Sequence, residues 1–145
     1  MKMLIGVMIL VISFGCSGRK GAQTTESVKT ESLQDDRVEV VYFHGKQRCV
    51  TCRSIEEQTR KILSEDYADE LKNGKIVFRE VDISDKEGEK VADTYEVTWS
   101  SLFVNRWKGG KEIRNNMTDF AFSKAVGDKA GFKAGLKAKI EELIK

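Results

Sequence analysis

Several features that define other protein classes are missing from this chain of 145 residues. It contains no proline, so no loop can be shaped by a cis X-Pro bond. The formal net charge is only +2 and no long basic run occurs, which argues against nucleic acid as a partner. No Gly-x-Gly-x-x-Gly motif follows an expected strand, so nothing indicates a flavin or nicotinamide site. The sequence therefore predicts no cofactor and no nucleic-acid partner.

A long transmembrane run is missing as well. The apolar run at residues 3–12 falls short of the roughly 20 residues that cross a bilayer as a helix. Lys2 precedes this run and small residues follow it, as in an export signal. The ending "SFGC" resembles a bacterial lipobox, in which the cysteine is acylated and becomes the first residue of the mature protein. We expect a lipoprotein signal peptide at residues 1–15 and lipidation at Cys16, with an ordinary signal peptide as the alternative.

The mature chain is expected to have two parts. Residues 16–35 are polar, so they cannot bury enough apolar surface to offset the entropy of ordering them. We interpret them as a flexible tether that joins the lipid anchor to a domain at the cell envelope, facing the periplasm or the exterior. Charged residues make up 33% of the chain and hydrophobic residues 40%, which is ordinary for a globular protein. Residues 36–145 are long enough for one domain with a single core.

The domain is expected to begin with a buried strand and a helix. Residues 38–43 form a dense β-branched and aromatic run that is apolar on both faces, which is typical of a central strand. Cys49 and Cys52 follow, and apolar residues then recur at helical spacing until Asn73-Gly74, which is a stop signal. Residues 75–84 are predicted to form a second strand.

The second half of the domain is expected to contain a hairpin between two helices. A short helix is predicted at residues 85–97. The segments 101–107 and 111–116 flank Gly109-Gly110, and two strands around a Gly-Gly turn indicate a β-hairpin. The final helix has an apolar face that contains Phe132, Leu136, Ile140, Leu143 and Ile144. The strand–helix–strand unit favours a parallel pair, to which the hairpin adds antiparallel strands.

This order of elements resembles the thioredoxin fold over residues 36–145. The resemblance implies an α/β domain with a central mixed β-sheet flanked by helices, and a Cys-x-x-Cys motif at the start of the helix after the central strand. "YFHGKQRCVTCRSIE" and "VTWSSLFV" are more narrowly similar to a group of thioredoxin-like lipoproteins of Bacteroidetes-type bacteria. That group is associated with arsenical resistance and labelled as nitrophenyl-compound nitroreductase subunits.

The cysteine pair carries the chemistry that we expect. At a helix start, the sulfur of Cys49 would face unpaired N–H groups and the positive end of the helix dipole, which lowers the pKa of a thiol below about 8.5. Lys46, Arg48 and Arg53 favour the thiolate in the same way. Cys52 lies one turn further on and can bridge to Cys49. We therefore predict that Cys49 is the attacking nucleophile and that Cys52 resolves the mixed disulfide.

Three positions depart from the thioredoxin pattern. The buried acid of the family, six residues before the first cysteine, falls on Phe43, so no carboxylate is expected beside the resolving thiol. Arg48-Cys49-Val50-Thr51-Cys52 replaces the usual Trp-Cys-Gly-Pro-Cys. Alignment of "YEVTWSS" places Ser101 at the position of the cis-proline. A cis bond before serine costs about 3 kcal/mol, so we expect a trans peptide there, altered peptide docking and room for a metal.

Two aromatic residues near the pair allow two interpretations each. His44 is either a strand-end histidine with local hydrogen bonds or a third ligand or proton shuttle beside the thiols. Two cysteines and one histidine fall short of a structural zinc site, although Cu(I) or As(III) could use Cys49, Cys52 and His44. Trp99 either shields the disulfide and contacts a partner or caps the core.

The sequence leaves three functions open. The first is a membrane-tethered thiol–disulfide oxidoreductase that exchanges disulfides with protein or small-thiol partners outside the cytoplasm. The second is a soft-metal or metalloid binder that uses the same cysteines. The third is a non-catalytic thioredoxin-like subunit that docks another protein. The redox direction, the partner and the oligomeric state do not follow from the sequence.

Overall fold

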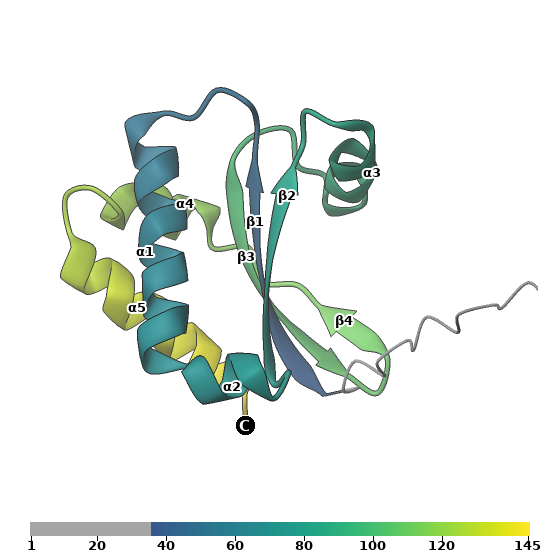
Figure 1. The fold of residues 1–145 in the computed structure, drawn as a ribbon, viewed down its shortest axis with the longest axis vertical. Coiled ribbons are helices and arrows are strands. Elements are labelled where there is room, and N and C mark those ends of the chain that lie inside the picture. Colours follow the sequence, from purple (N-terminus) through teal and green to yellow (C-terminus); the bar gives the residue numbers. More distant parts are fainter. Residues whose placement is uncertain (1–35) are drawn as a thin grey trace, which may run out of the picture. The chain divides into compact units, whose positions relative to one another are not determined.

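The computed structural model describes residues 36–145, which form a four-stranded sheet with helices on both faces (Figure 1). The strands are β1 (Arg37–His44), β2 (Ile76–Asp82), β3 (Ser101–Lys108) and β4 (Lys111–Ile113). The predicted signal peptide, lipidated cysteine and tether lie outside the described residues. Within the part that is described, no helix has the length and apolar character needed to span a membrane.

The sheet is mixed, and its strand order is β2-β1-β3-β4. β1 pairs in parallel with β2, whereas β1 with β3 and β3 with β4 are antiparallel. Because β1 is surrounded on both sides by strands, its dense apolar sequence is buried from Val38 to His44. The Gly109-Gly110 turn between β3 and β4 has both glycines at positive φ, which a residue with a side chain rarely adopts.

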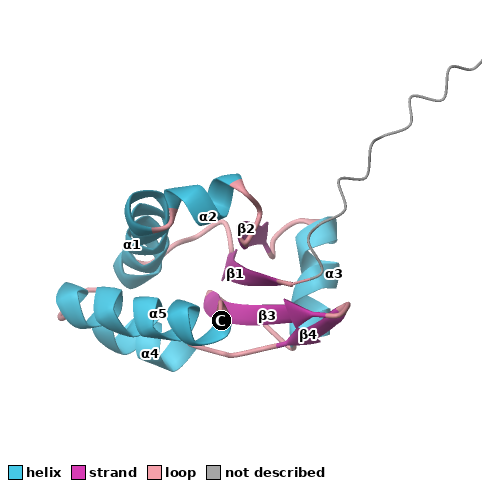
Figure 2. Ribbon diagram, turned by 90° about the horizontal axis from the view of Figure 1, so that it is seen from below, coloured by secondary structure: helices cyan, strands magenta, loops and turns pink. Residues whose placement is uncertain are grey.

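Five helices complete the domain: α1 (Val50–Asp66), α2 (Ala68–Lys72), α3 (Lys86–Tyr95), α4 (Thr118–Lys124) and α5 (Lys129–Leu143). In Figure 2, α1, α2, α4 and α5 lie to one side of the sheet and α3 lies to the other. The connections and strand order are those of the thioredoxin-like α/β fold. The predicted fold class, a mixed sheet flanked by helices, is therefore confirmed.

Three details of the predicted elements are wrong. The first helix does not continue to residue 72 but ends at Asp66; Tyr67 has a non-helical backbone and separates it from the helix α2. The second hairpin strand stops at Ile113 rather than at residue 116. The helix α4 was not predicted, because seven residues are too few to show a clear helical period.

Successive residues of β1 contribute to two different apolar clusters. Val38, Val40 and Tyr42 pack with α1 and α5, and this cluster contains most of the large buried side chains of the described domain. Val41 and Phe43 pack with α3 in a smaller cluster. This alternation follows from the two-residue period of a strand. It also determines which side chains of β1 can face the cysteine pair.

Candidate functional site

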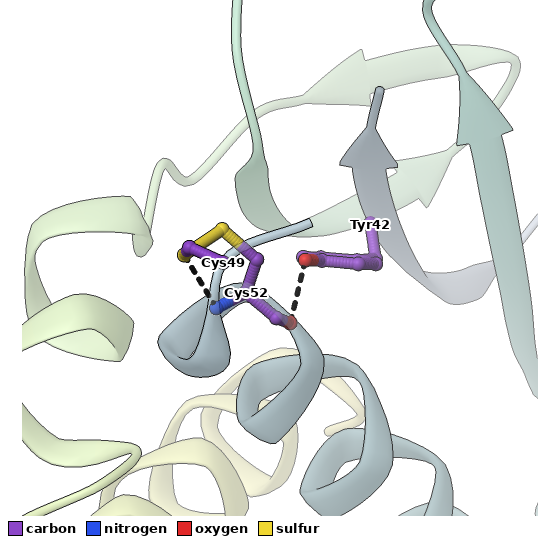
Figure 3. Close-up of a disulfide and its surroundings, with 3 residues drawn as sticks. All are labelled: Tyr42, Cys49 and Cys52. Carbon is purple, nitrogen blue, oxygen red and sulfur yellow. Dashed lines mark hydrogen bonds between the residues drawn. A yellow bond between two sulfur atoms is a disulfide. The ribbon is translucent and has the colours of Figure 1, made fainter. Parts of the chain in front are cut away.

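The two cysteines of the Cys-x-x-Cys motif form a disulfide at the start of α1 (Figure 3). Their Cα atoms are 5.0 Å apart. Cys49 has an extended backbone and caps α1, because the backbone N–H of Cys52 donates a hydrogen bond of 3.0 Å to the Cys49 sulfur. Cys49 is exposed, whereas Cys52 is only 8% exposed. An incoming group can therefore approach the first sulfur but not the second.

The helix start is also electrostatically suited to a thiolate. The first turn of α1 contains no acidic residue. A negative sulfur at the capping position would accept the same N–H group and would face the positive end of the helix. Lys46 and Arg53, which the sequence placed beside the pair, are exposed to solvent on either side of it. The arrangement therefore favours ionisation of Cys49 over ionisation of Cys52, which is buried.

Tyr42 is the residue of β1 that faces the cysteine pair. Its hydroxyl group donates a hydrogen bond of 2.7 Å to the backbone carbonyl of Cys52, and its side chain is fully buried (Figure 3). Burial raises the pKa of Tyr42, while a hydrogen bond with the Ser100 side chain opposes that rise. The hydroxyl thus links the first turn of α1 to the segment that enters β3.

Phe43, which the sequence aligned with the buried acid of the family, does not face the cysteine helix. Phe43 lies on the α3 face, where its ring packs 5.0 Å from Tyr95 and 5.8 Å from Phe103. Because side chains alternate along a strand, Phe43 and Tyr42 cannot both face α1. The phenol of Tyr42 is therefore the β1 side chain that contacts the first turn of α1.

A carboxylate does lie close to the motif, and sequence reasoning missed it. Glu56 is on α1, one turn after Cys52, and its side chain forms an ion pair with Arg48, the residue before Cys49. A second guanidinium nitrogen of Arg48 lies 2.9 Å from Nδ1 and 2.8 Å from Nε2 of His44. The sequence contains one indication that Glu56 lies near the motif: it follows Cys52 by four residues, a spacing that places both side chains on one face of the helix.

His44 is held by local contacts rather than gathered with the thiols. It is 8% exposed, and its Nδ1 lies 3.3 Å from the carbonyl oxygen of Gly45. Arg48 lies against both ring nitrogens. Among residues 36–145, no group of three or more histidine, cysteine or acidic side chains is arranged to hold a metal ion. The alternative ligand set of Cys49, Cys52 and His44 is thus not assembled as a metal site in the described domain.

The segment before β3 supplies the other wall of the site. Ser101 is paired with Phe43 across the sheet and is buried, and its hydroxyl donates a 3.1 Å hydrogen bond to the carbonyl of Trp99. Trp99 is 55% exposed and packs against Phe122 of α4 with ring centroids 5.0 Å apart. Trp99 thus covers Phe122, which packs against the main apolar cluster, and about half of its own surface remains exposed.

Comparison with known proteins adds structural similarity at low sequence identity. No protein-family model matches the chain, and neither does any curated protein. Oxidised thioredoxin O2 from Arabidopsis thaliana is 22% identical and has a TM-score of 0.48, with 75% of this chain and 76% of that chain covered. A thioredoxin from Thermus thermophilus is 20% identical, with coverage of 70% and 72% and a TM-score of 0.46. An uncharacterized thioredoxin-like protein from Porphyromonas gingivalis is 18% identical, with coverage of 74% and 76% and a TM-score of 0.38.

Proposed function

We propose that this protein is a thiol–disulfide oxidoreductase in which Cys49 attacks and Cys52 resolves. One observation carries the proposal: an exposed cysteine at a helix N-terminus is bridged to a buried cysteine one turn further on. A bridge over so short a loop contributes little to stability through chain entropy. A role in exchange chemistry explains the pair better than a structural role does.

The reaction proceeds in two exchange steps. In the reduced protein, the Cys49 thiolate attacks one sulfur of a partner disulfide; a mixed disulfide forms and the other partner sulfur leaves as a thiolate. Cys52 then loses its proton to solvent, and its sulfur attacks Cys49. The mixed bond breaks, the Cys49–Cys52 disulfide forms, and the partner leaves with two thiols. The protein pair loses two electrons and the partner gains two; the reverse sequence oxidises a dithiol.

Different parts of the site have different tasks in this reaction. The cap position of Cys49 stabilises its thiolate through the Cys52 N–H group. Tyr42 fixes the carbonyl of Cys52 and so fixes the turn that must bring the two sulfurs together. The segment of Trp99 and Ser101 lies at the same end of the sheet and offers a surface for a protein or small-thiol partner.

The cellular location is a second part of the proposal. It is supported by the sequence pattern alone: Lys2, the apolar run, the lipobox-like ending at Cys16 and the polar segment 16–35. Together they favour a lipid-anchored protein that works outside the cytoplasm. The similarity of "YFHGKQRCVTCRSIE" to lipoproteins associated with arsenical resistance favours the same location. Labelling the cells with palmitate tests this, because Cys16→Ala should abolish incorporation of the label.

Trapping of a mixed disulfide tests the chemistry. A chain with Cys52→Ser can form the bond between Cys49 and a partner but cannot resolve it. Incubation with a disulfide-containing protein such as native insulin should therefore give a covalent adduct that dithiothreitol releases. Cys49→Ser is the matched control, and both variants also carry Cys16→Ser; the control should give almost none, because its one remaining thiol, Cys52, is buried. Equal trapping by both variants, or by neither, would contradict the proposed roles.

A further inference from the structure

An ion pair spans the cysteine motif from one side to the other. Arg48 lies directly before Cys49 in the chain, and Glu56 lies seven residues after Cys49 on α1. Residues 49, 52 and 56 fall on one face of the helix, since they are spaced by three and four residues. The guanidinium group of Arg48 crosses toward this face and contacts both Glu56 and His44.

The pair is shielded from solvent compared with other ion pairs of the domain. The Arg48 side chain is 28% exposed and the Glu56 side chain is 17% exposed, whereas Lys61 and Glu65 of the next turns are both more than half exposed. Screening by water and salt is weaker for such a pair. Glu56 is also the first carboxylate along α1, so it is the acidic side chain of that helix closest to the disulfide in sequence.

The protonation state of Glu56 is consistent with a permanent negative charge. Burial raises the pKa of Glu56, but the hydrogen bond and the positive charge of Arg48 outweigh this effect and leave the pKa below its ordinary value. Arg60 adds a weaker contact of 3.5 Å to the same carboxylate. Glu56 is therefore ionised at neutral pH and can pair with the Arg48 guanidinium.

We infer that Glu56 is a positioning residue that tunes the redox balance of the Cys49–Cys52 pair by holding and neutralising the charge of Arg48. This inference rests on the proposed oxidoreductase function and states how two residues beside the cysteine pair set its redox equilibrium. A free Arg48 would stabilise the Cys49 thiolate, which exists only in the reduced protein. Neutralisation by Glu56 removes that advantage and shifts the equilibrium toward the disulfide, so the protein becomes a better reductant.

The direction of the effect distinguishes this inference from a purely structural role. Glu56→Gln leaves Arg48 without its counter-charge, so the dithiol form should become more favourable. Arg48→Gln leaves the Glu56 carboxylate without its partner, so the dithiol form should become less favourable. A general loosening of α1 would move both variants in the same direction. Opposite shifts therefore require an electrostatic cause.

A glutathione titration of the full chain measures these shifts. Trypsin cleaves after Arg48, or after Lys46 in Arg48→Gln, and after Arg53, so both cysteines are released in one peptide. Differential alkylation and mass spectrometry therefore report their redox state independently of Cys16. We expect the equilibrium constant with glutathione to move about tenfold toward the dithiol in Glu56→Gln, which is about 30 mV for a two-electron couple. Arg48→Gln should move it by a similar factor toward the disulfide. Glu57→Gln, at the exposed neighbouring position, should match the wild type.

The outcomes separate failure of this inference from failure of the proposed function. A wild-type pair that equilibrates with glutathione while Glu56→Gln behaves like Glu57→Gln overturns the inference alone. Shifts of the same sign in Glu56→Gln and Arg48→Gln overturn it as well. A wild-type pair that never exchanges with glutathione overturns both. If Glu56→Gln does not fold, as judged by circular dichroism, Arg48→Gln decides the question, and an unchanged potential there counts against the inference.

Discussion

The two faces of the sheet place very different demands on the same strand. On the α1 and α5 face, β1 contributes Val38, Val40 and Tyr42 to a large apolar cluster. The hydroxyl of Tyr42 donates a hydrogen bond to the carbonyl of Cys52. On the α3 face, β1 contributes Glu39, whose carboxylate accepts hydrogen bonds from Arg79 and from the indole of Trp107. The first face positions the cysteine helix, whereas on the second face Glu39 connects β1 to both of its neighbours, β2 and β3.

The two faces of the sheet show that one polar group can position the cysteine motif while another only stabilises the fold. Tyr95 on the α3 face is half-buried, and its hydroxyl donates to Glu112 and accepts a hydrogen bond from Asn105. Burial raises the pKa of Tyr95, and the hydrogen bond to Glu112 adds to that rise. Tyr42 and Tyr95 thus make similar interactions, but only Tyr42 contacts the motif. Substitutions on the two faces should therefore separate stability from redox behaviour.

The largest expected effect is a cavity in the α1 and α5 face. Phe132 of α5 is fully buried in the main cluster. Phe132→Ala should lower the free energy of unfolding by about 3–5 kcal/mol, through lost burial and the cavity left behind. Urea denaturation followed by circular dichroism measures this loss. Phe122→Ala, at a half-buried position of α4, is the control with a smaller loss; equal losses would contradict the assigned centre of the core.

Loss of the buried carboxylate on the α3 face should be the next largest effect. Glu39→Ala leaves the Trp107 N–H group without its acceptor, at a distance of 2.8 Å in the native protein, and removes the ion pair with Arg79. We expect a loss of about 1–3 kcal/mol of unfolding free energy. The glutathione equilibrium should stay unchanged. Glu39→Gln keeps an oxygen that can accept from the indole, so its loss of unfolding free energy should be smaller. A change of redox potential in either variant would contradict the claim that the α3 face affects stability alone.

Removal of the hydroxyl of Tyr42 or of Tyr95 compares the two faces of the sheet directly. Tyr42→Phe and Tyr95→Phe should each cost about 1 kcal/mol of unfolding free energy, the usual net value of a hydrogen bond. Only Tyr42→Phe frees the carbonyl of Cys52, so, with both cysteines present, only this variant should change the rate at which Cys52 resolves the mixed disulfide between Cys49 and a partner. Stopped-flow measurement of that rate with both proteins tests this. Identical rates would mean that Tyr42 is only part of the core.

The smallest expected effect is on the pH dependence of stability. The pKa of Glu56 lies below its ordinary value of 4.5, so its contribution is present above that pH and is lost as the pH falls through the lower folded pKa. As the pH is lowered below 4.5, the unfolding free energy of Glu56→Gln should therefore decrease less steeply than that of the wild type. Denaturant curves at several pH values measure the slopes. A Glu57→Gln slope that differs equally from the wild type would contradict the assignment to Glu56.

The sequence revealed those parts of the site that depend on local patterns. The run at residues 38–43 and the apolar spacing after Cys52 were sufficient to predict β1 and α1. The same run hid which of its residues face α1, because a strand that is apolar on both faces carries no alternation in its sequence. The phenol of Tyr42 was missed for this reason. Contact between Arg48 and Glu56 was missed because it depends on the path of the loop after β1, which no short pattern encodes.

Alkylation of the reduced pair at neutral pH tests the central claim most directly. With Cys16→Ser in place, Cys49 and Cys52 are the two thiols of the chain. Because Cys49 is an exposed helix cap and Cys52 is buried, iodoacetamide should modify Cys49 faster than it modifies free cysteine, and Cys52 much more slowly. Peptide mapping identifies the modified sulfur. If both thiols react no faster than free cysteine, or if Cys52 reacts first, Cys49 is not an activated nucleophile and the account is wrong.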